Sequence, residues 1–78
     1  MTNYYIGYKQ GNGEYVYVNA INDYSISVTI NEVNAINFLN EDIAKNVCEY
    51  LNLRDTTKKY IPLMVTTNIE ELVEEVKE

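Results

Sequence analysis

The feature that most constrains the fold is a turn signal between two stretches rich in tyrosine, valine and isoleucine. These stretches are residues 4–8 and 14–20, and Asn12-Gly13 lies between them. Asn-Gly is the preferred pair for a two-residue type I′ turn, because both central positions need a positive φ. The sequence therefore predicts an antiparallel hairpin that turns at Asn12 and Gly13.

The turn type sets the register of this hairpin and so decides which side chains share a face. A two-residue turn pairs Tyr8 with Tyr17. One side of the sheet would then hold Tyr4, Ile6, Tyr8, Tyr15 and Tyr17. The other side would hold Tyr5, Val16, Val18 and Ala20. A three-residue loop with a bulge would instead shift the pairing of one strand.

The next segment, residues 24–30, alternates apolar and polar side chains without a break. This period of two predicts a third strand that directs Ile26, Val28 and Ile30 to the core. Apolar and polar side chains alternate only weakly over residues 31–37. We interpret this segment as a connection that directs Val33 and Ile36 toward the core.

A helix is expected over residues 41–52, with Asn40 as its N-cap and acidic residues in its first turn. Its apolar positions, at helical spacing, are 43, 44, 47, 48 and 51. Cys48 belongs to this stripe, and we interpret it as a small buried residue, since free cysteines are commonly buried.

The remaining segments predict one more strand and one more helix. Residues 60–65 are apolar, with Pro62 expected at an edge or where its missing N–H would face solvent. Residues 69–78 follow a capping-box pattern, Asn68 with Glu71, and carry an apolar stripe at helical spacing. The fold class expected is a single α+β domain over 1–78: a three-stranded antiparallel meander plus an edge strand, packed against two helices in the order β-β-β-α-β-α.

Amino-acid composition limits the classes of function that the chain can have. The chain has 78 residues, six basic and twelve acidic, with no histidine and a formal net charge of −6. This balance disfavours direct binding to duplex nucleic acid or to an anionic membrane, which both depend on clustered lysine and arginine. Without histidine, zinc binding is not expected, and Ser25, Ser27 and Cys48 lack the usual base for nucleophilic catalysis. We therefore expect a non-enzymatic protein without metal or cofactor.

The cellular location follows from cysteine usage and hydropathy. One cysteine cannot form an internal disulfide, which favours a reducing cytoplasm. The longest apolar runs have four residues or fewer, so the chain is expected to be neither exported nor membrane-spanning.

Two surfaces are candidates for binding a partner. The first is an acidic face on the predicted terminal helix, formed by Glu70, Glu71, Glu74, Glu75 and Glu78. It would imitate a phosphate backbone toward a basic protein, or would only keep a solvated helix soluble. The second is the aromatic face of Tyr4, Tyr8, Tyr15 and Tyr17. It would contact a protein or stack single-stranded bases, or would only stabilise the sheet by cross-strand packing.

The arrangement resembles small accessory proteins encoded by phages and mobile elements of low-GC Gram-positive bacteria. In these a tyrosine-rich hairpin, here residues 4–8 and 14–18, precedes an Ala-x-x-Phe pattern, here Ala35 and Phe38, and an acidic helix over 41–51. Eleven asparagines and eight isoleucines beside one arginine fit an AT-rich coding bias. The resemblance implies no catalytic residue. It implies the cytoplasm of a bacterial host cell as the location, and a setting rich in inhibitors of host defence nucleases, such as anti-CRISPR and anti-restriction proteins.

The leading hypothesis is therefore an inhibitor that binds a host protein with a basic, nucleic-acid-handling surface, through the acidic helix, the aromatic face or both. The alternative is a small module that binds or sequesters a nucleotide or a single strand by tyrosine stacking. A third interpretation is a homodimer whose sheet faces pair.

Overall fold

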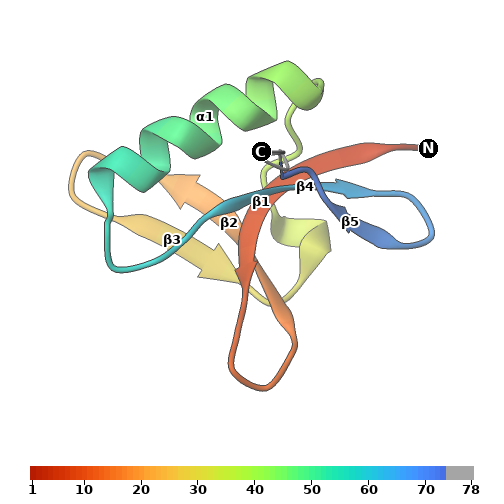
Figure 1. Ribbon diagram of the computed structural model, residues 1–78, viewed down its shortest axis with the longest axis horizontal. Helices are drawn as coiled ribbons and strands as arrows, with labels where there is room; N and C mark the ends of the chain where they lie inside the picture. Colours follow the sequence, from red (N-terminus) through yellow and green to blue (C-terminus); the bar gives the residue numbers. More distant parts are fainter. Residues whose placement is uncertain (74–78) are drawn as a thin grey trace, which may run out of the picture.

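The described residues form one five-stranded antiparallel sheet together with a 3-10 helix and an α-helix (Figure 1). The computed structural model of the protein describes residues 1–73. The strands run in the spatial order β3-β2-β1-β4-β5. Their bounds are β1 Asn3–Lys9, β2 Tyr15–Ile21, β3 Ile26–Thr29, β4 Ile61–Val65 and β5 Ile69–Glu71. A 3-10 helix, η1 (Glu32–Asn34), and one α-helix, α1 (Glu41–Arg54), connect β3 to β4.

The sequence-based fold class, with two helices, is wrong at the end of the chain. Ile69–Glu71 forms strand β5, antiparallel to β4, where a second helix was expected. The turn between the two strands is held by the Thr66 N–H, which donates to the Asn68 carbonyl at 3.1 Å. Strand pairing gives β4 hydrogen-bond partners on its second side, which a helix would leave unpaired. The remainder of the expected helix, 74–78, lies outside the described residues.

Pro62 lies in an interior strand, not at an edge, because β4 runs between β1 and β5. Its carbonyl accepts a hydrogen bond from the Leu72 N–H at 2.8 Å, on the side of β5. The nitrogen and carbonyl of one strand residue point to the same side, so the missing N–H also faces that side. In the β4–β5 register Pro62 lies opposite Leu72, one position beyond the Leu63–Glu71 pair, so the proline removes only the last hydrogen bond of this pairing.

The first hairpin turns through a three-residue loop, the arrangement that shifts the register by one position. The Gly13 N–H donates to the Gln10 carbonyl at 2.9 Å, and the Gln10 N–H donates to the Glu14 carbonyl at 2.8 Å. Gly13 has φ +88°, whereas Asn12 does not have the positive φ that a type I′ turn requires. The loop fits a type I turn followed by a left-handed glycine.

This register separates the tyrosines that were expected on one face. Gly7 lies opposite Tyr17, and Lys9 lies opposite Tyr15. Because side chains alternate along a strand, Tyr15 and Tyr17 share a face with Tyr5, whereas Tyr4 and Tyr8 lie on the other face with Ile6. The prediction of a single aromatic face formed by Tyr4, Tyr8, Tyr15 and Tyr17 is therefore wrong.

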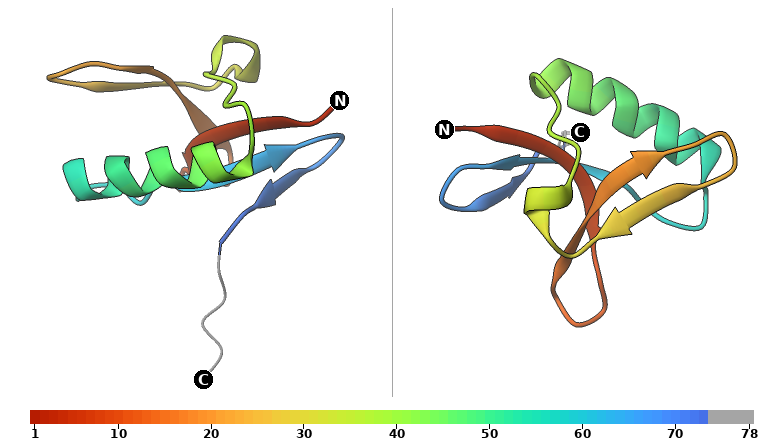
Figure 2. Two further views of the ribbon diagram at one scale, coloured as in Figure 1. Left: turned by 90° about the horizontal axis from the view of Figure 1, so that it is seen from above. Right: turned by 180° about the vertical axis from the view of Figure 1, so that it is seen from behind.

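Helix α1 covers one face of the sheet and η1 lies on the other, so β1 runs between them (Figure 2). The core on the α1 side is built on the buried residues Ile6, Val18, Cys48, Leu51 and Tyr60. The core on the η1 side is built on Tyr5, Tyr17, Leu63 and Val65. Ile26, Val28 and Ile36 pack against the α1-side core as expected, but Ile30 and Val33 are exposed.

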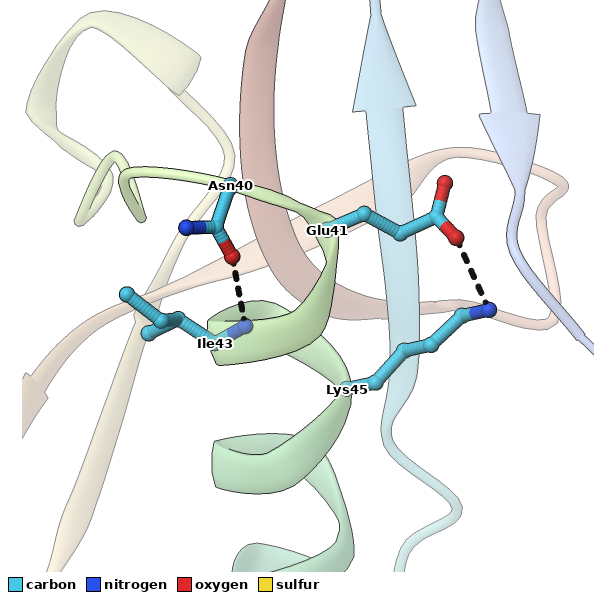
Figure 3. A network of polar contacts seen from close by, with 4 residues as sticks. All are labelled: Asn40, Glu41, Ile43 and Lys45. Atoms are coloured by element: carbon cyan, nitrogen blue, oxygen red, sulfur yellow. Dashed lines mark hydrogen bonds and ion pairs between the residues drawn. The ribbon is translucent and has the colours of Figure 1, made fainter.

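The expected helix is confirmed, with its end two residues later, at Arg54. The Asn40 side chain caps it, since its Oδ1 accepts a hydrogen bond from the Ile43 N–H at 2.9 Å (Figure 3). In the next turn the carboxylate of Glu41 pairs with Lys45 at 3.0 Å. Both signals are local in the chain, which is why the sequence predicts this element well.

Candidate functional site

The sheet face opposite α1 brings three tyrosines together with two carboxylates. We call this surface the tyrosine–carboxylate face. It consists of Tyr5, Tyr15, Tyr17, Glu32 and Glu71. The tyrosines come from β1 and β2, whereas Glu32 belongs to η1 and Glu71 to the edge strand β5. Residues distant in sequence therefore meet on one side of the sheet.

The rings are held in a fixed arrangement. The Tyr5 and Tyr17 rings pack edge to face, with centroids 5.5 Å apart and planes at 64°. Tyr15 lies nearer the hairpin end, where its hydroxyl donates a hydrogen bond to Glu71 Oε2 at 2.5 Å. The Lys9 ammonium lies 5.3 Å from the Tyr15 ring centroid, within range of a cation–π contact.

Burial and nearby carboxylates raise the pKa of all three tyrosine hydroxyls. Burial raises the pKa of Tyr5 and of Tyr17, and the negative charge of Glu32 adds to both shifts. The hydrogen bond to Glu71 is the main cause that raises the pKa of Tyr15 to about 12, with burial second. These hydroxyls therefore stay protonated to a higher pH than that of a free tyrosine, and they can donate hydrogen bonds to the neighbouring carboxylates.

The Tyr15–Glu71 contact predicts a pH dependence. An unfolded tyrosine ionises near pH 10, whereas the folded-state pKa of Tyr15 is about 12. The stabilisation from this contact is thus fully present below about pH 10 and is lost as the pH rises through 12. Glu71→Gln should lower the pKa of Tyr15, measured by carbon-13 NMR of tyrosine Cζ. Glu70→Gln is the control, and an unchanged Tyr15 titration in Glu71→Gln would refute the contact.

The structure places only two of the four expected aromatic-face residues, Tyr15 and Tyr17, on this surface. Tyr8 packs in the α1-side core, its ring 5.8 Å from that of Tyr60 and edge to face with it. Tyr4 lies on the same side as Tyr8, and its carbonyl accepts from the Phe38 N–H at 2.7 Å. Neither contributes to the tyrosine–carboxylate face.

The expected acidic face is not formed by the residues described. Glu70 and Glu71 are neighbours in β5, so their side chains point to opposite sides of the sheet. The other members, Glu74, Glu75 and Glu78, lie outside the described residues. Only Glu71 joins the tyrosine–carboxylate face.

Sequence reasoning missed Tyr5 and Glu32 as members of this face. Tyr5 was assigned to the opposite side because of the one-residue register error. Gly13 fits the left-handed last position of a three-residue loop as well as it fits a type I′ turn, and the register of the longer loop places Tyr5 correctly. Glu32 lies in a connection without a clear period, so its approach to the sheet depends on the tertiary fold.

A groove of about 440 Å³ runs between α1 and the β4–β5 end of the sheet. Its polar groups include Cys48, Asn52 and Tyr60. Asn52 Nδ2 donates to the Tyr60 carbonyl at 2.9 Å, and its Oδ1 accepts from the Tyr60 N–H at 2.7 Å. Burial raises the pKa of the Cys48 thiol to about 11, which keeps it protonated. The two Asn52 hydrogen bonds tie α1 to the residue that precedes β4.

No family model, curated protein or solved structure matches this chain. Among residues 1–73, no helix is both long enough and apolar enough to cross a membrane. In the same range, no group of three or more acidic or cysteine side chains is placed to hold a metal ion.

Proposed function

We propose that this chain is a non-enzymatic binding protein that docks a basic group of a protein partner on the tyrosine–carboxylate face. One observation carries the proposal: Glu32 and Glu71, from two separate elements, act on tyrosine hydroxyls of the sheet face on the η1 side. Carboxylates held beside neutral hydroxyls favour a cationic ligand.

The bonding capacity of Glu71 supports a cationic ligand. A carboxylate has about four acceptor positions, and the structure assigns one of those on Glu71 to the Tyr15 hydroxyl. Its side chain is exposed, so the other positions can accept hydrogen bonds from an arginine or lysine of the partner. The Lys9 ammonium already lies over the Tyr15 ring, so this part of the face accommodates a cation.

The charge of the whole chain favours the same partner class. A net charge of −6 attracts a basic surface and speeds association with it. Proteins that handle nucleic acids present such surfaces, and the resemblance to phage and mobile-element accessory proteins suggests that class. By covering the basic surface, the chain would act as an inhibitor of a host defence enzyme.

The burial of the rings favours a protein partner over a single-stranded nucleic acid. Base stacking needs an open ring face, but Tyr5 and Tyr17 are buried and pack edge to face. Of the three tyrosines on the tyrosine–carboxylate face, only Tyr15 is partly exposed, and its ring already faces Lys9. One such ring is a poor platform for successive bases.

An NMR titration tests the proposal. The probe is a short arginine-rich peptide, and a peptide with citrulline at each arginine is the neutral control. We expect amide shifts at Tyr15, Tyr17, Glu32 and Glu71 with the arginine peptide only. We also expect their loss near 1 M salt, where the screening length falls to about 3 Å. Shifts confined to other residues, or equal shifts with citrulline, would contradict the proposal.

A further inference from the structure

The two edges of the sheet are protected differently. Edge strands commonly carry charge or proline, which prevents pairing with other chains. Strand β5 follows this rule, since it has three residues and two of them, Glu70 and Glu71, are charged. The segment that contains β3, residues 24–30, has neither charge nor proline nor glycine. Its composition is that of a strand that can accept a further strand.

The outward-pointing backbone groups of β3 can be identified from its turn. The Ser25 carbonyl accepts a hydrogen bond from the Asn22 N–H at 2.8 Å, so Ser25 directs its backbone groups toward β2. Direction alternates along an antiparallel strand, and the register irregularity lies on the β2 side of the pair, at Asn19. Ser27 and Thr29 therefore also face β2, whereas the N–H and carbonyl groups of Ile26 and Val28 face outward.

The side chains at both ends of the segment are exposed apolar groups. Tyr24 is 99% exposed and Ile30 is 72% exposed. Ile30 directly follows β3, and Tyr24 lies in the turn just before it. A strand added to this edge would therefore lie beside two apolar side chains that lack cover within the described part of the chain.

The segment is complementary to an antiparallel copy of itself. With a two-fold axis at Ser27, the outward-facing Ile26 lies opposite Val28 of the second copy, which completes hydrogen-bonded pairs. Beyond the paired strands, the turn that holds Tyr24 comes near Ile30 of the copy, which partly covers both side chains. Asp23 lies in the turn before β3 and outside the paired strands, so no like charges oppose each other within the pair. Such an interface is isologous and closed.

We propose that β3 is a dimerisation edge, at which two copies pair antiparallel about Ser27 and join their five-stranded sheets into one continuous sheet. The charge-free segment favours a second copy as the occupant, because two acidic chains can meet there without direct charge repulsion. The tyrosine–carboxylate face is a separate surface, so the dimer does not depend on the proposed binding function.

Cysteine cross-linking tests the register. Ser27 is exposed, and the proposal places the two Ser27 residues opposite each other in a non-hydrogen-bonded pair. Their Cα atoms would lie about 4.5 Å apart, within disulfide range. Thr29→Cys is the control, because the two copies of residue 29 would be about 13 Å apart along the strands. The native Cys48 is buried and should not react.

Under mild oxidation with glutathione disulfide, Ser27→Cys should form a covalent dimer and Thr29→Cys should stay monomeric. Equal cross-linking of the two variants would overturn the proposal, because random collision would then explain it. Absence of a Ser27→Cys dimer at a protein concentration where sedimentation shows association would overturn the register.

Sedimentation equilibrium tests the edge independently. The unsubstituted chain should show a monomer–dimer equilibrium, and Ser27→Lys should weaken it about fivefold or more by placing like charges opposite each other. Thr67→Lys adds the same charge at an exposed turn near the other edge and should not weaken it. The proposal would be contradicted if the unsubstituted chain is monomeric, even if it pairs with strands of other proteins. It would also be contradicted if Ser27→Lys and Thr67→Lys weaken the dimer equally.

Discussion

Replacement of Gly7 by alanine is expected to destabilise the fold by about 3 kcal/mol. A Cβ at this position would overlap the backbone carbonyl of Val16 in the adjacent strand. Gly7 pairs with both β2 and β4, so neither neighbour can move without disturbing a ladder. A chain of 78 residues has about 4–12 kcal/mol of total stability, and this loss would remove a large part of it.

Gly11→Ala is the matched control for the Gly7 prediction. A Cβ on Gly11 would meet no atom within 4 Å, and its φ is not positive. Its stability should therefore change by no more than about 0.5 kcal/mol. Urea denaturation followed by circular dichroism measures both variants. Equal stability of the two would contradict the close approach of β1 and β2.

Replacement of Leu51 by alanine should cost about 2–5 kcal/mol. Leu51 is completely buried in the α1-side core, where it packs with Ile6, Val18 and Tyr60. The substitution removes apolar contacts and leaves a cavity that the sheet and helix cannot fully close. Thermal or urea unfolding should show a large loss of stability with the secondary structure of the folded state retained.

Leu53→Ala tests whether α1 buries the face assigned to it. Leu53 lies two residues further along the same helix and is 78% exposed. The intrinsic helix preference changes equally in both variants, so any difference reports burial. Leu53→Ala should change stability by less than about 0.5 kcal/mol. Similar losses in the two variants would mean that the helix is rotated from its described position.

The elements predicted well from the sequence are those specified by neighbouring residues. Helix α1 begins at its asparagine cap and follows its apolar stripe, and the buried state of Cys48 follows from the same stripe. The strand at 26–29 likewise follows its alternation. These signals depend on residues a few positions apart, so no knowledge of the tertiary fold is needed.

The C-terminal segment shows where local signals fail. Asn68 and Glu71 fit a capping box, but Ile69–Glu71 gains more by pairing with β4. The helix would also have placed like charges four residues apart, as in Glu70 and Glu74, which weakens it. Local periodicity does not reveal pairing with another strand, and this pairing determines the structure of Ile69–Glu71.

The candidate site depended on a register that differs by one residue between two turn types. Asn12-Gly13 favours a two-residue turn, but Gly13 can equally supply the left-handed residue of the three-residue loop that the chain adopts. One position of shift moves every side chain of a strand to the other face. Tyr5 was therefore exchanged for Tyr4 and Tyr8 in the aromatic surface, and the partnership with Glu32 and Glu71 could not be foreseen.

The most direct test of the tyrosine–carboxylate face compares two neighbouring glutamates. Glu71 lies on this face and Glu70 on the other, so Glu71→Gln and Glu70→Gln remove the same charge from opposite sides of the sheet. Affinity for the arginine-rich peptide is measured by tyrosine fluorescence. Glu71→Gln should weaken binding about tenfold, the loss of one hydrogen bond to a charged group, and Glu70→Gln should leave it nearly unchanged. Equal weakening by both variants would show that only net charge matters and would contradict a defined docking face.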